Sequence, residues 1–214
     1  TSSLVVSGIS TLANTVTTSG LQTYTGAVTL GANTTLSTGS SAGNILFGST
    51  VDGAFTLTTI TTGGTTFTAA VGGTPLTGLT VTTATLSAGD ITLVSNAALS
   101  ITNSGAGSVT GIITGLGVTL TKTGVGTLTL SGANTYGGNT TVNGGILAVS
   151  STGTLGNNVS TLTINSATVD LQRAVTVASL LMSGTTPTIT NSTGTSSLEV
   201  SGISTLANAV TTSG

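Results

Sequence analysis

Apolar and polar residues alternate with a period of two over many short stretches of the chain. In GAVTLG (residues 26–31), for example, Val28 and Leu30 flank a threonine, and TLTINS (161–166) repeats the pattern. Such alternation is typical of strands with one buried face. Gly-Gly and Gly-Ala-Asn turns separate the stretches. The best helical candidate, 171–182, has an alternating Val-Thr-Val centre that favours a strand. The pattern predicts an all-β chain of many short strands.

The composition narrows the choice among all-β folds. Low-complexity Ser/Thr/Gly chains are often disordered, but here 37% of residues are hydrophobic and only two are proline. Thr, Val and Ile are β-branched and suit strands. Aromatic residues make up 2% of the chain, too few for the thick core of a sandwich. We therefore expect a β-solenoid with a narrow core, in which coils of roughly 20 residues stack along one axis.

The chain ends by repeating its beginning. Residues 195–214 match residues 1–20 at 18 of 20 positions with an offset of 194, and differ only at Val5/Glu199 and Thr15/Ala209. We interpret 1–194 as one structural repeat and 195–214 as the start of the next copy, so the solenoid is expected to be uncapped and to continue at both ends. Alternation places positions 5 and 15 on the solvent side. The predicted core of the repeat junction comprises Leu4, Val6, Ile9 and Leu12, and in the second copy Leu198, Val200, Ile203 and Leu206.

Residues 119–156 read TLTKTGVGTLTLSGANTYGGNTTVNGGILAVSSTGTLG and resemble the autotransporter-associated β-strand repeat. Residues 22–53 are similar to repeats of filamentous-haemagglutinin-like surface proteins. The resemblance implies a right-handed parallel β-helix outside a Gram-negative bacterium, acting as an adhesin, stalk or fibre, with no catalytic residues to transfer. We expect Lys122 to be a surface lysine at a strand end. The matching positions are Lys122, Gly124, Gly126, Leu128, Leu130, Gly132, Asn134, Tyr136, Gly138, Thr141, Val142, Gly145 and Leu147.

The inventory of reactive side chains is small. Without His or Cys, Ser-His and Cys-His nucleophile systems and thiolate metal sites are impossible. The four acids, Asp52, Asp90, Asp170 and Glu199, are widely separated and fit turn positions. We expect no catalytic site, no metal site and no cofactor. A net charge of −2 with two basic residues predicts no nucleic-acid binding, and no apolar run is long enough for a transmembrane helix.

Two short motifs recur along the chain. Thr-x-Thr pairs begin at residues 23, 56, 80, 119, 127, 161 and 188, at intervals of 33, 24, 39, 8, 34 and 27 residues. An ice-binding array needs such pairs on one face, so the irregular intervals favour threonine as the outward half of ordinary strands. The Asn-x-Ser/Thr sequons, expected to cap turns, are at Asn33, Asn139, Asn158 and Asn191.

The sequence as a whole predicts a non-enzymatic structural segment of a bacterial cell-surface or secreted fibre. Its partners are expected to be neighbouring copies stacked end to end, with lateral contacts between fibres because little charge opposes them. An adhesin passenger domain is the main alternative. An ice-binding protein and a polysaccharide-degrading β-helix, in which two acids meet across coils, are less favoured.

Overall fold

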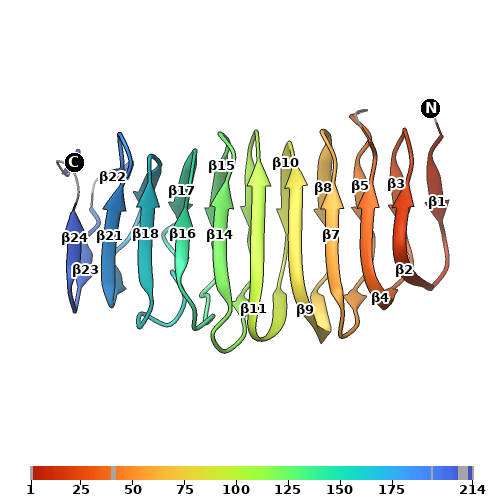
Figure 1. The fold of residues 1–214 in the computed structure, drawn as a ribbon, viewed down its shortest axis with the longest axis horizontal. Coiled ribbons are helices and arrows are strands. Elements are labelled where there is room, and N and C mark those ends of the chain that lie inside the picture. The colour runs from red at the N-terminus through yellow and green to blue at the C-terminus, as the bar shows by residue number, and fades with distance from the viewer. Residues whose placement is uncertain (1, 40–41, 194, 207–211, 214) are drawn as a thin grey trace.

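The computed structural model describes residues 2–39, 42–193, 195–206 and 212–213. Residues 212 and 213 are described by their main chain alone. The chain winds into one elongated stack of coils with its two ends at opposite ends of the stack (Figure 1). All strand pairs are parallel, and the described residues contain no helix, hence none able to cross a membrane. The predicted all-β parallel β-solenoid is confirmed.

One side of the solenoid, here called face A, is a continuous parallel sheet of 11 strands. Its registered positions advance by 18 to 23 residues from one coil to the next, for example from Leu4 to Gln22 and from Gln22 to Ile45. Eleven strands define ten coils. The strands are β1 (Leu4–Val6), β3 (Gln22–Tyr24), β5 (Ile45–Phe47), β8 (Gly64–Phe67), β10 (Thr85–Ala88), β12 (Gly107–Val109), β15 (Thr127–Leu130), β17 (Ile146–Val149), β19 (Thr168–Leu171), β22 (Thr188–Thr190) and β25 (Thr212–Ser213).

A second sheet wraps around a corner and supplies the other two sides. Its strands are β2 (Ser10–Thr17), β4 (Val28–Ser37), β6 (Val51–Asp52), β7 (Thr56–Ile60), β9 (Val71–Thr83), β11 (Ile91–Asn103), β13 (Ile113–Thr114), β14 (Thr119–Thr123), β16 (Thr140–Val142), β18 (Thr161–Asn165), β21 (Ser179–Ser183) and β24 (Ser204–Leu206). In β2 and β11 the register shifts after Leu12 and after Leu93. Asn14 and Asn96 take positive φ angles of 62° at these corners, a conformation that asparagine tolerates better than most residues.

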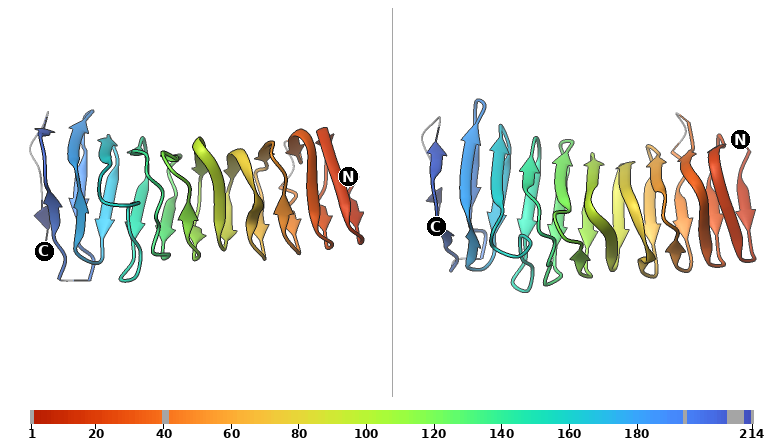
Figure 2. Two further views of the ribbon diagram at one scale, coloured as in Figure 1. Left: turned by 90° about the horizontal axis from the view of Figure 1, so that it is seen from below. Right: turned by 60° about the horizontal axis from the view of Figure 1, so that its bottom comes forward.

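The corner divides this sheet into face C, before it, and face B, after it. Face C contains the first parts of β2, β4, β9 and β11 together with β6 and β13. Later in the chain it contains the pair β20 (Val175–Val177) and β23 (Leu198–Val200), because β20 lies between β19 of face A and β21 of face B. Face B contains the last parts of the long strands and β7, β14, β16, β18, β21 and β24. Figure 2 shows the same stack from two further directions.

Files of equivalent side chains from successive coils fill the interior. On face A, one file begins with Tyr24, Phe47 and Phe67, whose rings stack with centroid separations of 5.5 and 4.8 Å. Smaller side chains, Ala88 and Val109, continue the same file. Three of the four buried aromatic residues thus stack on one another in consecutive coils instead of being spread through a thick core.

The predicted alternation correctly identifies the inward residues. The alternating apolar residues of 28–30, 118–120, 128–130, 162–164 and 169–171 are at most 2% exposed. The residues concerned are Val28, Leu30, Val118, Leu120, Leu128, Leu130, Leu162, Ile164, Val169 and Leu171.

The predicted junction core is right in part. Leu12 is buried, and the pairs Leu4/Val6 and Leu198/Val200 are partly buried against the core. The prediction is wrong for Ile9 and Ile203, whose side chains are 84% and 83% exposed. Each stands in the corner between two faces, outside the alternating stretch. Leu206 shares the inward file of Met182 but is 49% exposed, because it lies in the terminal coil.

The two positions that differ between the repeated ends lie on the surface where they are described. Val5 is 65% exposed and Glu199 is exposed, as is Thr15. Ala209 lies outside the described residues. Because the change from valine to glutamate occurs on the solvent side, it avoids the cost of burying a charge.

The aromatic file provides a test of the core. Phe47→Ala should lower the free energy of unfolding by about 3–5 kcal/mol, because Phe47 is fully buried between two rings. Leu46→Ala, the matched control on the outward side of the same strand, should cost about 1 kcal/mol. Urea-induced unfolding followed by circular dichroism measures both. Equal losses would contradict the assigned orientation of β5.

Candidate functional site

Lys122, predicted to lie on the surface, is completely buried. It stands in the inward file of face B, between Ile101 and Val142 of the neighbouring coils. Its Nζ donates hydrogen bonds to the main-chain carbonyl oxygens of Thr123 (2.6 Å), Gly124 (2.9 Å) and Gly144 (3.3 Å). Burial lowers the pKa of the ammonium group to about 8. The prediction is wrong because the carbonyl groups at this corner supply an internal partner for the charge.

A file of polar side chains explains why a charge fits there. At the corner between faces B and A, Thr38 donates to Thr61 (2.8 Å), and Thr83 donates to the Gly63 carbonyl (2.9 Å) of the preceding coil. Asn103 continues the file and donates to the Thr127 carbonyl (2.8 Å).

The next coil has no side chain at this corner. Gly124 occupies the position with φ +79°, and an added Cβ would lie 2.4 Å from the Asn103 carbonyl oxygen. The ammonium group of Lys122 reaches the corner from two residues earlier and supplies the donor that the file otherwise lacks. Lys122 therefore links main-chain groups of two coils.

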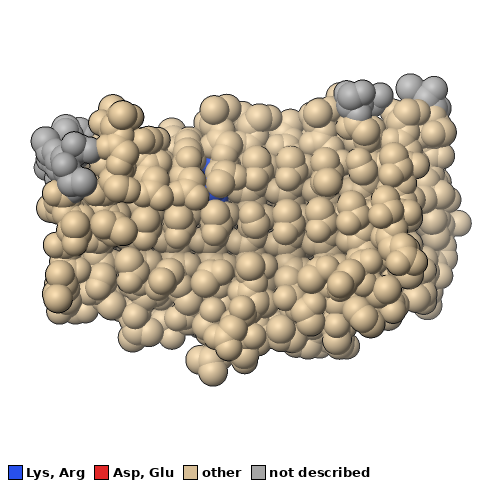
Figure 3. Space-filling view, in the orientation of Figure 1, with Lys and Arg blue, Asp and Glu red and all other residues tan. Residues whose placement is uncertain are grey.

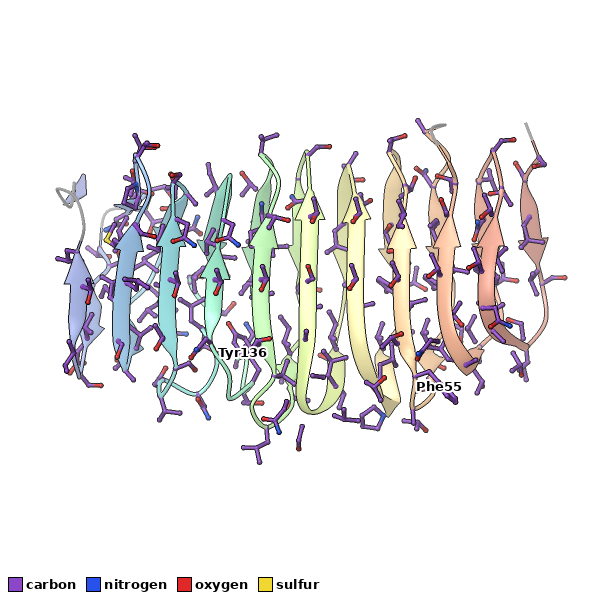
Figure 4. The ribbon with its side chains drawn as sticks, viewed as in Figure 1. Phe55 and Tyr136 are labelled. Carbon is purple, nitrogen blue, oxygen red and sulfur yellow. The ribbon has the colours of Figure 1, made fainter. Side chains whose placement is uncertain are left out.

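Asn134 and Tyr136 complete the polar part of the motif. Asn134 Oδ1 accepts a bond from the Ile113 N–H (2.8 Å), and its Nδ2 donates to the Thr154 carbonyl (2.8 Å), so one side chain connects three coils. The buried Tyr136 hydroxyl lies 2.7 Å from Thr140 Oγ1. Burial raises the pKa of this phenol, opposed by the bond to Thr140. Figure 4 places Tyr136 near the lower end of its coil.

The glycines of the motif allow the coils to approach one another. A Cβ on Gly126 would lie 2.0 Å from the Gly105 carbonyl oxygen, and one on Gly132 would lie 1.9 Å from that of Gly111. Neither distance can accommodate a side chain. The motif leucines 128, 130 and 147 are fully buried. The motif thus specifies how one coil stacks on the next.

The comparison with known families bears on this same segment. Residues 120–149 match the passenger-associated-transport-repeat family. The match confirms the resemblance noted in the sequence, and its span runs from β14 to β17 of the solenoid. No curated protein and no solved structure matches the chain significantly.

The structure separates the four acids and gives each one hydrogen-bond donors. Asp52 accepts a bond from the Thr74 N–H (3.0 Å), and Asp90 accepts one from the Ile112 N–H (2.7 Å), in each case from the following coil. Glu199, on face C, lies 3.4 Å from the Thr176 hydroxyl. Within the described residues, no three potential metal-ligating side chains of His, Cys, Asp or Glu gather.

Asp170 is the most heavily bonded acid. It accepts bonds from Gln172 Nε2 (2.9 Å) and from the hydroxyl (2.7 Å) and N–H (2.9 Å) of Ser192. Burial alone would raise the pKa of this carboxyl, but the hydrogen bonds outweigh burial and lower it. The neighbouring Arg173 contacts the carbonyls of residues 152 and 153. This cluster fastens one coil to the next.

Of the sequon asparagines, Asn191 caps its own turn as predicted, whereas Asn33 and Asn139 accept hydrogen bonds from the main chain of the following coil. The side-chain oxygens of Asn33, Asn139 and Asn191 accept main-chain N–H bonds from Thr56, Thr161 and Thr193 respectively. Asn158 takes a positive φ of 66° in a turn.

The Thr-x-Thr pairs are distributed between two faces. The pairs that begin at residues 56, 80, 119 and 161 lie on face B, and those that begin at 23, 127 and 188 lie on face A. The irregular intervals in sequence therefore arise from two interleaved sets and from coils of unequal length. Irregular intervals therefore do not exclude the alignment of these threonines on one face, and they are not a valid reason to disfavour an ice-binding array.

The buried lysine predicts a specific pH dependence of stability. Between pH 8 and 10 the folded state should release the Lys122 proton while the unfolded state, with an ordinary pKa of 10.5, retains it. The free energy of unfolding should therefore rise with pH. Above pH 10 the trend should reverse, because burial raises the pKa of Tyr24 to about 12 and opposes its ionisation in the folded state.

Lys122→Met serves as the matched variant, because it keeps an unbranched side chain only one atom shorter and removes the titrating group. Its free energy of unfolding should be lower and should not rise between pH 8 and 10, as measured by urea unfolding at several pH values. A rise of the same size in Lys122→Met would assign the effect to another group.

Proposed function

We propose that the chain is a non-enzymatic structural segment of a secreted or surface-exposed bacterial fibre, built from copies of 194 residues stacked end to end. The match to a passenger-associated repeat supports export to the cell surface. The uninterrupted parallel solenoid supports a structural role, because main-chain hydrogen bonds join each coil to the next along the long axis.

The observation that carries the proposal is the strand pairing of residues 195–214, which repeat the opening stretch 1–20. Residues Leu198–Val200 pair in register with Val175–Val177, and Ser204–Leu206 pair with Leu180–Met182. Residues 198–200 and 204–206 thus continue the parallel pairing of the preceding coil, which supports the proposal that a second copy stacks directly on the first.

The register also gives the geometry of the proposed array. In the first copy, β1 lies on face A and Ser10–Leu12 on face C. In the second copy, the equivalent residues Leu198–Val200 lie on face C and Ser204–Leu206 on face B. Each segment of the second copy thus lies on the face that follows, along the chain, the face occupied by the same segment of the first copy. From β1 to β22 there are ten face A strands, or nine coils, so one period equals nine and one third coils.

Proteins of one, two and three tandem copies test this proposal. With a strand spacing of about 4.8 Å, each added copy should lengthen the particle by about 45 Å at constant width. Image averaging should show each copy rotated by one third of a turn from the previous one. Electron microscopy measures both quantities. Separate compact particles joined by flexible connections would contradict end-to-end stacking.

A further inference from the structure

The outward side chains at the centre of face B form one file in which all but one carry a hydroxyl group. Each member pairs in register with the next across successive coils, and the sequence intervals of 18 to 24 residues disappear in the stacking. This central file consists of Thr15, Thr35, Thr58, Thr80, Ser100, Thr121, Thr141, Thr163, Leu181 and Thr205. Its first eight positions are all threonine or serine.

Parallel files flank the central file on both sides. Two residues later on the same strands lie Thr17, Ser37, Ile60, Thr82, Thr102, Thr123, Asn143, Asn165 and Ser183. Two residues earlier lie Thr56, Gly78, Ala98, Thr119, Asn139, Thr161 and Ser179. Face B is therefore a two-dimensional lattice in which hydroxyl groups predominate, with a repeat of about 4.8 Å along the axis and about 6.6 Å along the strands. The flanking files are interrupted by Ile60, by Gly78 and by asparagines 139, 143 and 165.

The lattice is neutral and rigid. The files named above contain no charged residue, and the one lysine of the sheet, Lys122, points inward. Figure 3, which views this side, shows no red and a single small patch of blue. The strands stay nearly parallel along the whole stack (Figure 1). Threonine is stiff at χ1, which fixes the positions of the hydroxyl groups.

The hydroxyls of the central file are available to water. All of these side chains are exposed or partly exposed. In the part of the chain that the structure describes, none of these hydroxyls bonds to another protein group.

The other faces lack this regularity. The outward file of face A is interrupted by Leu46, Ala148 and Asp170. That of face C is interrupted by Asp52 and by glycine at position 72. Among the three faces, an uninterrupted neutral hydroxyl file over eight coils is thus found on face B of the described residues.

We propose that face B binds the surface of ice. The two repeat distances of its lattice are close to repeat distances on crystal planes of hexagonal ice. Fixed hydroxyl groups at such spacings hold bound water in positions that a crystal can continue, and the intervening methyl groups discourage competing orientations. Charged groups, which would orient water differently, are absent from its files. This inference goes beyond the proposed structural role and does not depend on tandem stacking.

Two other occupants fit face B less well. A crystalline polysaccharide is usually held by aromatic stacking or by charged and amide groups, and the central file has neither. A second copy of the chain would need an apolar surface to bury, whereas the central file contains a single large apolar side chain, Leu181.

The test uses the 214-residue chain and two double variants. Thr80→Lys with Thr121→Lys places two bulky charges in the central file of face B. Thr66→Lys with Thr129→Lys, the matched control, makes the same change at outward positions of face A. Partition of the protein into a slowly growing ice hemisphere and thermal hysteresis are measured, and circular dichroism checks that each variant is folded.

The unchanged chain and the face A variant should enter ice and slow its growth, while the face B variant should be excluded like an ordinary soluble protein. Exclusion of the unchanged chain would overturn the inference, and so would equal activity of both variants. Self-association, or binding to crystalline cellulose or chitin, that is lost only in the face B variant and occurs without ice binding would assign the face to those occupants instead. None of these outcomes alters the particle lengths that test the fibre.

Discussion

Every coil of this protein must hydrogen-bond to the coils on both sides at one fixed spacing, and the rest of the structure follows from that constraint. Stacked coils bring equivalent residues into contact, so each interior position becomes a file in which neighbours must fit one another. The aromatic file Tyr24–Phe47–Phe67 satisfies this requirement by stacking rings. The bare main chain at Gly126 and Gly132 satisfies it by leaving the corners open to the adjacent coil.

Corners present a different problem from faces, because the sheet ladder is interrupted there and main-chain groups lose their regular partners. The chain answers with side chains that reach across coils. Asn134 joins three coils, Asp170 gathers donors from the coil above it, and Lys122 places an ammonium group among carbonyl oxygens. An unpaired charge inside a narrow core would be costly. The Lys122 ammonium group is instead hydrogen-bonded to three carbonyl oxygens from two coils, and it therefore cross-links those coils.

Much of the fold could be predicted from local pattern, because a period of two identifies inward residues such as Leu128 and Leu162 wherever the strands lie. The motif around Lys122 likewise identified the solenoid class. Prediction failed where the answer depended on register. Coils of unequal length hide the alignment of Thr58, Thr80 and Thr121.

The burial of Lys122 and the exposure of Ile9 and Ile203 are set by corners, which alternation does not describe. The general rule that lysine is exposed and isoleucine is buried fails at such positions, because the direction of a side chain depends on the turn and on the adjacent coil. Only the stacked structure contains that information.

The shift of the repeated stretch from face A to face C has a consequence for any flat partner of a tandem array. A plane can lie along only one side of a straight rod, and in an array with this register a given side returns after three copies. A flat partner such as a mineral, a crystal or a cell wall would then contact the same face of the solenoid at regular intervals of about 135 Å. The rod would present the same set of contact sites in three directions around its axis. Its binding to a flat surface would therefore not depend on its rotation about that axis.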